Sequence, residues 1–330
     1  MWRNFLLIDQ FGRNINYLRI SVTDKCNLRC GYCIPPGQTG LFLPENILTN
    51  RQLLRLVSLF AEAGINRIRL TGGEPLLRED LPELIKSIKN IKGIDNVSVT
   101  TNGLLLHRRL PDLLHAGLDG INLSLDTLDA RQYAKLTGSD TLLQVIKGLN
   151  EALNLPATEM KLNCVIQEDN ISQIVPLAQL AWENRIAVRF IELMPFGPGQ
   201  KLKFISNDMV LTQLEKAFGP AQPIAEELAG GPAEYVMFHG FCGKVGFISA
   251  VSRPFCLQCN RIRITANGLL KPCLQYRSGK DLKALMDSGA DDDSLRTAIE
   301  ETVKLKPKGH HFGKEAGAED EGLYMNQIGG

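Results

Sequence analysis

Three cysteines lie within eight residues near the start of the chain, in Cys26-Asn-Leu-Arg-Cys30-Gly-Tyr-Cys33. Thiolates are soft ligands that suit iron–sulfur clusters and also zinc. Because the stretch offers three thiols, a four-iron cluster bound here would keep one iron without a protein ligand. An open coordination position is typical of catalytic metals. The alternative is a zinc site that takes a fourth ligand from elsewhere, although zinc ligands usually occur as two separated pairs.

A second group of three cysteines occurs far along the chain, at Cys256, Cys259 and Cys273. A second iron–sulfur cluster with an open iron is the sharper hypothesis. Zinc, with Cys242 or His239 as the fourth ligand, is the alternative. We expect the two groups to face each other across the mouth of a barrel, one holding a cofactor and the other a substrate.

Bulk composition excludes several classes of protein. The 330 residues are enough for about two domains. Lys and Arg number 37 against 36 acidic residues, so no global charge attracts nucleic acid or a membrane surface. Eight cysteines in clustered groups indicate metal sites in a reducing compartment and not a disulfide framework. No apolar run has the length of a signal peptide or a membrane span, so we expect a cytoplasmic, soluble protein.

Strand patterns rich in β-branched residues alternate with helical patterns in the first two thirds of the chain. Strands are expected at 17–23, 67–71, 96–101, 121–126, 160–166 and 187–193, and helices at 50–63, 80–90, 108–116, 129–136, 141–153 and 172–184. This alternation predicts parallel βα units with right-handed crossovers. Six units are too few for a closed eight-fold barrel. We therefore predict an α/β fold: an open, partial TIM-type (β/α)6 barrel over 1–205, with a smaller cluster-binding region over 206–330.

The C-terminal region has a different pattern. We expect a helix at 208–217, a loop at 220–232, a hairpin of 235–238 with 244–249, short helices near 281–287 and 293–303, and a polar, Gly-rich tail. A tail of that composition is by default dispensable. Met325 and Ile328, however, are apolar where a solvated tail needs no apolar group, and terminal glycines fit into narrow spaces.

Candidate ligand-binding residues gather where the predicted strands end. Ligands of such folds lie at the carboxyl ends of the strands. The pair Gly72-Gly73 follows the second strand and would let backbone atoms approach a ligand, the alternative being a plain turn. The ends of the third, fourth and sixth strands carry Thr100, Ser124 and Met194.

Basic residues inside the predicted strands form another group. They are costly within a barrel unless paired, and these strands carry too few acids to pair them all. An anionic ligand would balance them, and arginine suits phosphate. We expect Arg19, Arg69 and Lys161 to bind it, and Arg67 and Arg189 to face solvent or helix carboxylates. Cys164 has the opposite parity to Lys161 and is expected in the core.

Together these residues resemble one family, the radical S-adenosylmethionine (SAM) GTP 3',8-cyclases of molybdenum cofactor biosynthesis. The spacing of the first cysteines is typical of the radical SAM superfamily, and the second triad with the terminal Gly329-Gly330 narrows the resemblance to the cyclases. It covers essentially the whole chain. Its specific markers are Arg69-Leu-Thr-Gly-Gly-Glu-Pro75, Leu123-Ser-Leu-Asp-Thr-Leu128, Arg189-Phe-Ile-Glu-Leu-Met-Pro195 and Cys256-Leu-Gln-Cys-Asn-Arg-Ile-Arg-Ile264.

The resemblance implies SAM and two [4Fe-4S] clusters as cofactors, bound by Cys26, Cys30, Cys33, Cys256, Cys259 and Cys273. The first cluster would reduce SAM to methionine and a 5'-deoxyadenosyl radical, which takes hydrogen from ribose C3' of GTP so that C3' adds to guanine C8. The implied SAM contacts are Tyr32, Gly73, Ser124 and Met194. The implied GTP contacts are Arg19, Arg69, Thr100, Lys161, Arg261 and Arg263, with the guanine at the second cluster. Arg19 is also implicated in the radical steps, and the double-glycine tail reaches into the active site.

The resemblance also implies partners. We expect a flavodoxin- or ferredoxin-like electron donor and a downstream cyclic pyranopterin monophosphate synthase, with no nucleic acid or membrane partner; a homodimer is one assembly the sequence allows. One departure is Ile34-Pro35-Pro36, where the family usually has Met-Pro-Glu. The alternatives are another two-cluster radical SAM enzyme, such as a peptide-modifying maturase, and a non-catalytic zinc-binding protein.

Overall fold

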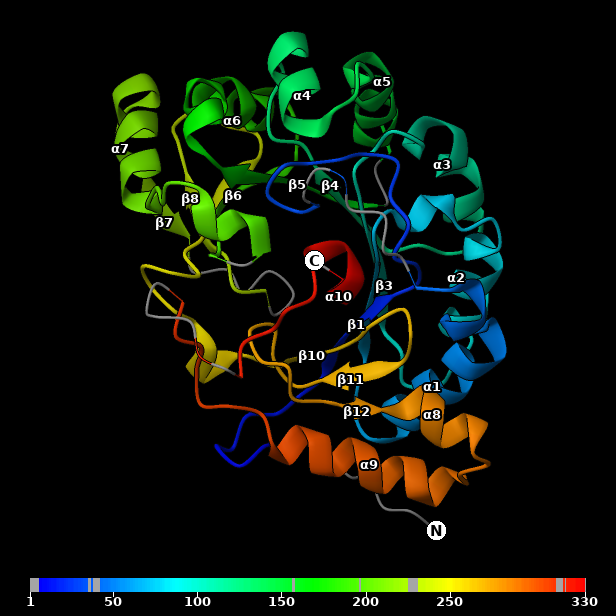
Figure 1. Ribbon diagram of the computed structural model, residues 1–330. Helices are drawn as coiled ribbons and strands as arrows, with labels where there is room; N and C mark the ends of the chain where they lie inside the picture. Colours follow the sequence, from blue (N-terminus) through cyan, green and yellow to red (C-terminus); the bar gives the residue numbers. More distant parts are fainter. Residues whose placement is uncertain are drawn as a thin grey trace.

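One β-sheet organises the fold (Figure 1). The computed structural model describes residues 6–34, 37, 42–155, 158–195, 197–224, 231–312, 317 and 319–329. Within them, twelve strands lie in the order β12-β11-β10-β1-β2-β3-β4-β5-β6-β9-β8-β7. Their bounds are β1 Tyr17–Ser21, β2 Arg67–Thr71, β3 Asn96–Thr101, β4 Gly120–Ser124, β5 Glu159–Ile166, β6 Ala187–Glu192, β7 Gln222–Ile224, β8 Glu234–Met237, β9 Lys244–Ile248, β10 Arg261–Ile264, β11 Leu269–Lys271 and β12 Lys280–Asp281.

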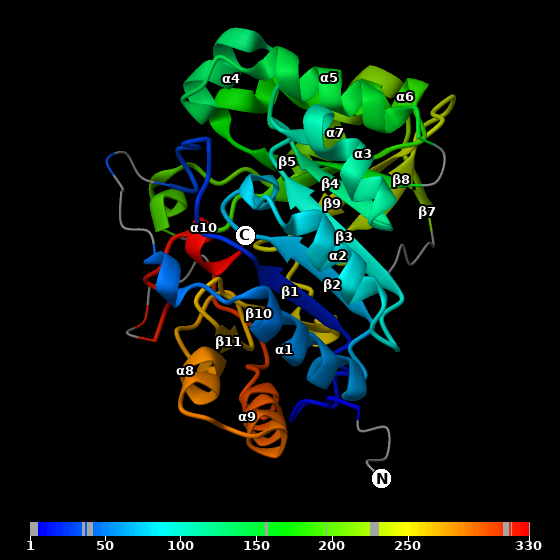
Figure 2. The ribbon, with the colours of Figure 1, turned by 90° about the vertical axis from the view of Figure 1, so that its right-hand side faces the viewer.

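Helices α1 to α7 lie outside the curve of the sheet, as the two views in Figures 1 and 2 show. The helices are α1 Asn50–Glu62, α2 Leu81–Lys89, α3 Leu106–His115, α4 Ala130–Thr137, α5 Leu142–Leu153, α6 Ile174–Glu183, α7 Asn207–Phe218, α8 Leu282–Asp287, α9 Asp292–Lys304 and α10 Met325–Ile328. Short 3-10 helices occupy Pro44–Asn46, Pro75–Leu77, Glu168–Gln173, Gly197–Lys201 and Cys256–Gln258. No helix in the described ranges is long and apolar enough to cross a membrane.

The predicted (β/α)6 unit is confirmed. Strands β1 to β6 are neighbours in chain order, and every pairing between them is parallel. The end strands of the sheet, β12 and β7, do not pair with each other, so the barrel is open. Local signals fix the helices between the strands. At α1, for example, Thr49 and Gln52 form a reciprocal capping box, which satisfies backbone donors at the helix start.

The C-terminal region extends this sheet at both edges. β9 pairs in parallel with β6, and β10 pairs in parallel with β1. We did not expect β10, β11 or β12, nor β7, which lies inside the expected loop 220–232; residues 225–230 of that loop are outside the described ranges. The alternation of Arg and Ile in β10 is the signal that would have identified a strand. The domain boundary at 205/206 stays a prediction, and the sheet runs continuously across it.

The two faces of the sheet differ in chemistry. Residues of one parity face the helices and are almost fully buried apolar side chains, such as Leu18, Ile20, Ile68 and Leu70. Cys164 is 1% exposed and belongs to this core, as predicted. Residues of the other parity line the concave side and are mostly polar or basic. The outer face therefore drives folding by apolar burial, which leaves the inner face for a ligand.

Candidate active site

The first cysteine loop follows β1 and is held by backbone hydrogen bonds from two neighbours. Gly73 and Glu74 donate N–H groups to the carbonyls of Thr23 and Lys25, at 2.8 and 2.7 Å. A Cβ at Gly73 would lie 2.2 Å from the Lys25 oxygen, so glycine is required for this close approach. On the other side, Arg29 donates to the Thr137 carbonyl at 2.8 Å. The glycine pair thus has a structural role at the cysteine loop, whatever ligand it also meets.

The electrostatics of this loop keep its three thiols protonated in the absence of a metal. Burial raises the pKa values of the Cys26, Cys30 and Cys33 thiols, that of Cys33 to about 12. Neighbouring thiols of the same group add to the rise at Cys30 and Cys33. Without a metal these half-buried thiols therefore stay protonated at neutral pH. A cluster bound here would displace their protons, because the thiolate is the ligand form, and its iron would supply the positive charge that three adjacent thiolates need.

Glu74 is a residue to which the sequence analysis gave no role. Its carboxylate is 1% exposed and accepts hydrogen bonds from Leu76 N at 3.0 Å, from Thr101 Oγ1 at 2.7 Å and from Asn102 N at 2.7 Å. Burial raises its pKa to about 7. Asn102 in turn directs its amide at Cys26 Sγ, 3.8 Å away. Glu74 therefore ties the ends of β2 and β3 to the cysteine loop. Its place in Gly72-Gly73-Glu74-Pro75 was the available signal.

The residues expected at SAM occupy the same edge of the sheet as the first cysteines. Gly73 follows β2, Ser124 ends β4, and Met194 lies two residues beyond β6. The side chain of Tyr32 is engaged with Asp126, whose carboxylate also accepts from Val165 N at 2.8 Å. Burial raises the pKa of Asp126 to about 6. The predicted SAM contact of Tyr32 would therefore use its backbone and not its hydroxyl.

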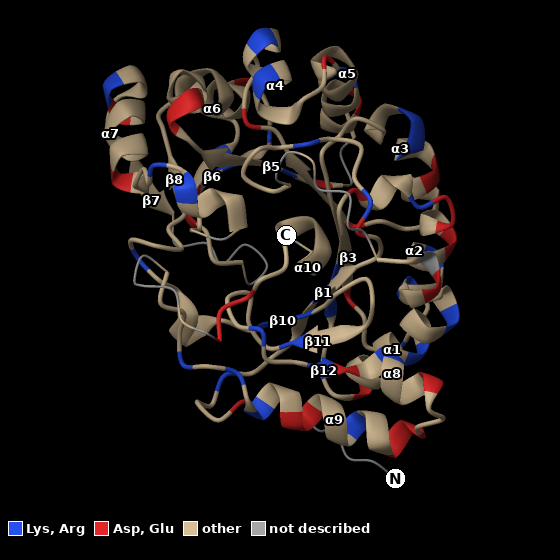
Figure 3. Cartoon of the chain, viewed as in Figure 1, with Lys and Arg blue, Asp and Glu red and all other residues tan. Residues whose placement is uncertain are grey.

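Arginines form a row across the inner face. Arg69 of β2, Arg19 of β1 and Arg263 of β10 lie side by side in parallel register (strands and basic positions in Figure 3). Burial, reinforced by Arg263 and Arg69, lowers the pKa of Arg19, and burial lowers that of Arg263 to about 10. Like charges in register are destabilising without a counter-charge. Arg69 Nε and Arg261 Nε are buried and have no hydrogen-bond partner among the described residues.

Thr100, Asn122 and Lys161 form a second row on β3, β4 and β5. Lys161 pairs with Glu159 at 2.6 Å, and burial lowers its pKa to about 8. Thr100 Oγ1 is buried with no hydrogen-bond partner in the described part of the chain.

The prediction that Arg189 faces solvent or helix carboxylates was wrong. It is 3% exposed and points inward, where amide oxygens of Asn163 and Asn122 accept from it at 2.8 and 2.6 Å, since its parity matches that of Lys161.

The second cysteine triad lies at the opposite end of the inner face from the first. Cys256 and Cys259 precede β10, Cys273 follows the antiparallel β11, and Tyr17 N donates to Asn260 O at the amino end of β1. The expectation that the two triads face each other across one mouth was wrong. β10 runs parallel to β1, so the two loops lie at opposite ends of the strands, roughly 16 Å apart for the five residues of β1.

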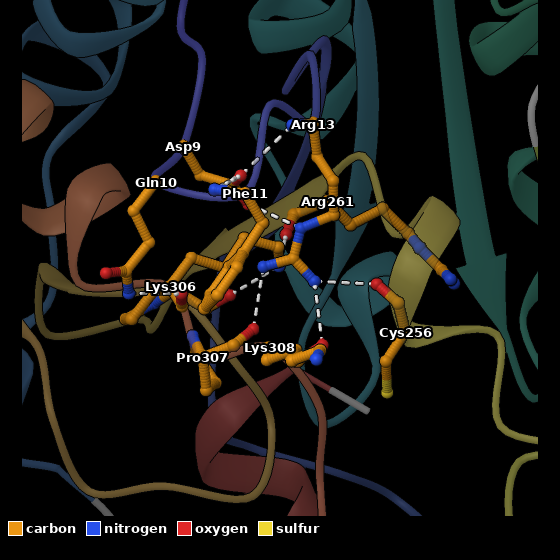
Figure 4. A network of polar contacts seen from close by, with 10 residues as sticks. Asp9, Gln10, Phe11, Arg13, Cys256, Arg261, Lys306, Pro307 and Lys308 are labelled. Atoms are coloured by element: carbon orange, nitrogen blue, oxygen red, sulfur yellow. Dashed lines mark hydrogen bonds and ion pairs between the residues drawn. The ribbon is translucent and has the colours of Figure 1, made fainter.

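Two buried basic side chains support the second triad. Arg13, paired with Asp9, donates to the backbone oxygens of Cys256 at 2.6 Å, Pro307 at 2.6 Å and Lys308 at 3.2 Å (Figure 4). Lys306 donates to the Arg261 and Pro272 oxygens, each at 2.7 Å. Burial raises the pKa of Cys259, but Arg261 and Lys306 outweigh that effect and bring it to about 6. A thiolate, which is the ligand form, is thereby favoured.

A fourth ligand for zinc is not assembled at this triad. Cys242 is exposed in the turn before β9, where its N–H donates to the Trp182 carbonyl, and His239 lies in the same turn. Within the described residues, no three His, Cys, Asp or Glu side chains are arranged to hold a single metal ion. A single zinc ion at this triad would therefore need a further ligand that the described residues do not bring to it.

The C-terminal tail returns to the inner face, and Figure 1 shows α10 inside the curve of the sheet. Ile328 is fully buried, and Asn326 donates to the Asp24 carbonyl at 3.0 Å. Gly329 has φ +72°, and a Cβ there would lie 2.6 Å from Thr71 Oγ1. Arg263 donates to the Gly329 carbonyl at 3.4 Å. The tail thus lies between the arginine row and the first cysteine loop; Gly330, like Pro35 and Pro36, is outside the described residues.

Comparisons with known proteins agree with this geometry. The radical SAM superfamily model matches residues 20–181, and the Molybdenum Cofactor Synthesis C model matches residues 186–312. The GTP 3',8-cyclase of Clostridium perfringens (strain SM101) is 41% identical over 323 residues, which cover 98% of this chain and 99% of that protein. This chain belongs to the GTP 3',8-cyclase family. The GTP 3',8-cyclases of Pelotomaculum thermopropionicum and Thermodesulfovibrio yellowstonii are 41% and 40% identical, over 98% and 91% of this chain and 99% and 94% of theirs.

The fold of this cyclase-family chain is similar to that of Streptococcus suis SuiB, crystallised with S-adenosylmethionine. The TM-score is 0.56 at 19% identity, covering 90% of this chain and 69% of SuiB. Membership of the family favours the cyclase over both alternatives that the sequence left open, a peptide-modifying maturase and a non-catalytic zinc-binding protein. The assignment of individual residues to SAM, GTP and the clusters stays a prediction.

Proposed function

We propose that this chain converts GTP to (8S)-3',8-cyclo-7,8-dihydroguanosine 5'-triphosphate, the first step of molybdenum cofactor biosynthesis, as a radical SAM lyase. The observation that carries the proposal is the row Arg69–Arg19–Arg263, placed between two cysteine triads on the inner face of a radical SAM barrel. Such a row needs an anion with several charges, and a triphosphate is one. Family membership supplies the identity of that anion.

The first triad and the residues around it would hold SAM. Cys26, Cys30 and Cys33 would bind three irons of a [4Fe-4S] cluster, which supplies, when bound, the electron that cleaves SAM to give the radical that takes the C3' hydrogen. Tyr32, Gly73, Ser124 and Met194 would orient SAM, since they surround the same edge of the sheet. Glu74 and Asn102 would hold Cys26 in place.

The basic rows would hold GTP. Arg19, Arg69 and Lys161 would neutralise the phosphates, Thr100 would use its buried hydroxyl, and Arg19 lies centrally enough to act on the reacting nucleotide as well. Arg261 and Arg263 lie on β10, directly after Cys256 and Cys259, and would contact the part of GTP nearest the second triad. Ligands that together reach from one triad to the other must span roughly 16 Å, the length of β1.

A second [4Fe-4S] cluster at Cys256, Cys259 and Cys273 belongs to the proposal. Support comes from the three thiols, which lie near enough to one another for Cys259 and Cys273 to raise the pKa of Cys256, and from Arg261 and Lys306, which lower the pKa of Cys259. Arg13 and Lys306 would fix the carbonyls of that loop so that the thiolates stay in place. The guanine base would meet the open iron of this cluster.

The proposed reaction would take place in the cytoplasm. The chain would take electrons from a flavodoxin- or ferredoxin-like donor and pass its product to a cyclic pyranopterin monophosphate synthase, alone or as a homodimer. The proposal is tested by anaerobic incubation of reconstituted protein with GTP, SAM and a reductant, followed by mass spectrometry. We expect 5'-deoxyadenosine and the cyclised GTP in equal amounts. SAM cleavage without any GTP-derived product would refute the proposed substrate.

A further inference from the structure

A buried ion pair marks the point where the tail turns toward the inner face. Lys271, the last residue of β11, has a fully buried side chain and pairs with Glu321, whose side chain is 4% exposed. Lys271 Nζ also donates to the Tyr276 carbonyl at 2.5 Å. A buried ion pair usually contributes no more to the stability of a fold than apolar residues of similar volume. The pair therefore indicates a role other than stability.

Glu321 accepts hydrogen bonds from the tail through the carboxylate oxygen that does not pair with Lys271. Its Oε1 accepts from Gly322 N at 2.8 Å and Leu323 N at 2.9 Å, and its own N–H donates to the Gln275 carbonyl at 2.6 Å. Just before Glu321, the backbone of Asp320 forms an isolated antiparallel β-bridge with Tyr276. Arg277 N also donates to the Glu319 carbonyl at 2.9 Å. The carboxylate therefore fixes the direction in which the chain leaves this short pairing.

The tail reaches the inner face within a few residues of this point. Tyr324 precedes α10, which ends at Ile328, and Gly329 then lies against Thr71 and Arg263. α10 has a single turn and only a few residues separate Glu321 from Gly329. A change in the direction of the backbone at Glu321 would therefore shift the position of Gly329. We propose that Lys271 is a positioning residue for GTP cyclisation, acting through Glu321 to set where the tail enters the inner face. The inference rests on the proposed function.

The test compares Lys271→Met in two backgrounds, the full chain and the chain lacking Gly329 and Gly330. If Lys271 acts through the tail, Lys271→Met slows cyclisation about tenfold or more in the full chain, as expected for a misplaced active-site group. In the shortened chain it slows the residual rate by less than about twofold, because the group it positions is already gone. Iron content and SAM cleavage stay at the parental level. Lys203→Met is the matched control, since it removes an exposed ion pair with Glu168.

Hydrogen exchange supplies a readout that does not depend on turnover. Amides of residues 325–329 should exchange about tenfold faster in Lys271→Met, while those of β1 to β6 stay protected. Should the single variant lose iron or fail to fold, Lys271→Met/Glu321→Leu restores apolar packing and should fold. It should still expose the tail, because leucine cannot accept from Gly322 and Leu323.

Two results would overturn the inference. One is an equal slowing by Lys271→Met in the full and the shortened chain, since the effect would then not pass through the tail. The other is parental exchange of residues 325–329 in both variants. A parental protein that makes no cyclised GTP would instead refute the proposed function, and the exchange measurement would still decide whether Lys271 positions the tail.

Discussion

Arg19 of β1 and Arg263 of β10 lie side by side in parallel register, although they come from opposite halves of the chain. Arg69 flanks Arg19 on the other side. The pairing exists because β10 returns to the edge of the sheet beside the first strand. It places a cation from the second cysteine region next to one from the first, which makes a single anion site out of two distant segments.

The arginine row should recognise the triphosphate. Arg69→Ala is expected to weaken GTP binding by about 1.5–3 kcal/mol, the range for a hydrogen bond to a charged group. SAM binding should stay within about twofold of the parental value. Arg69 lies in the middle of β2, whereas the residues predicted to bind SAM lie at or beyond the carboxyl ends of the strands. Equilibrium binding of both ligands under anaerobic conditions measures this. Equal loss for both ligands, or a drop in melting temperature that explains the loss, would point to a structural role.

GTP binding should depend on pH through Lys161. Burial lowers the pKa of its ammonium group to about 8 in the chain without GTP. The charged form attracts phosphate, so affinity is greatest below pH 8 and falls as pH rises through that value toward pH 9. A bound triphosphate favours the ammonium and raises its pKa, so binding near pH 8 takes up protons. Titrations in buffers of different ionisation enthalpy detect this uptake. Lys161→Met should bind more weakly with a flatter profile, and an unchanged profile would contradict the assignment.

Both cysteine triads should hold four-iron clusters. Protein reconstituted without oxygen should contain about eight irons per chain. Cys30→Ala should abolish SAM cleavage, whereas Cys259→Ala should stop GTP turnover and leave some uncoupled SAM cleavage. Iron and sulfide analysis with electron paramagnetic resonance measures the count. Four irons after full reconstitution, or zinc at the second triad, is the contrary result.

Glu74 should matter for stability and for the first cluster. Glu74→Ala leaves three donors without an acceptor, the buried groups of Leu76 and Thr101 and the part-buried N–H of Asn102. Each costs about 1–3 kcal/mol when water does not replace the carboxylate. We expect a lower melting temperature and less iron at the first triad. Glu79→Ala is the matched control, because Glu79 is an exposed acid in the same connection. Parental stability of Glu74→Ala would show that water takes over the three bonds.

Gly329 should be needed for its conformation and its lack of a side chain. Gly329→Ala adds a Cβ that would lie 2.6 Å from Thr71 Oγ1, at φ +72°. We expect GTP cyclisation to fall as steeply as on deletion of Gly329 and Gly330, with folding, iron content and SAM binding retained. Gly219→Ala is the control for backbone strain alone, since Gly219 has φ +85° and nothing within 4 Å of an added Cβ. If the Gly329→Ala protein turns over GTP at the parental rate, the tail does not act at this point.

The sequence by itself determined the βα units and the two cysteine triads. Helix starts such as Thr49 and the β-branched strands are local signals, and local signals act within a few residues. The first triad and Gly72-Gly73 are also contiguous, so their chemistry could be predicted from spacing. Arg19, Arg69 and Lys161 followed from one further step, the alternation of side chains along a strand.

Tertiary structure alone decided how distant segments meet. The direction of β10 placed the second triad at the far end of the inner face, and strand register placed Arg263 beside Arg19. The inward position of Arg189 and the pairing of Lys271 with Glu321 depend likewise on partners from other segments. Periodicity specifies which side chains share a face of one strand. It does not specify which strand lies beside it, because that choice is made by packing of the whole sheet.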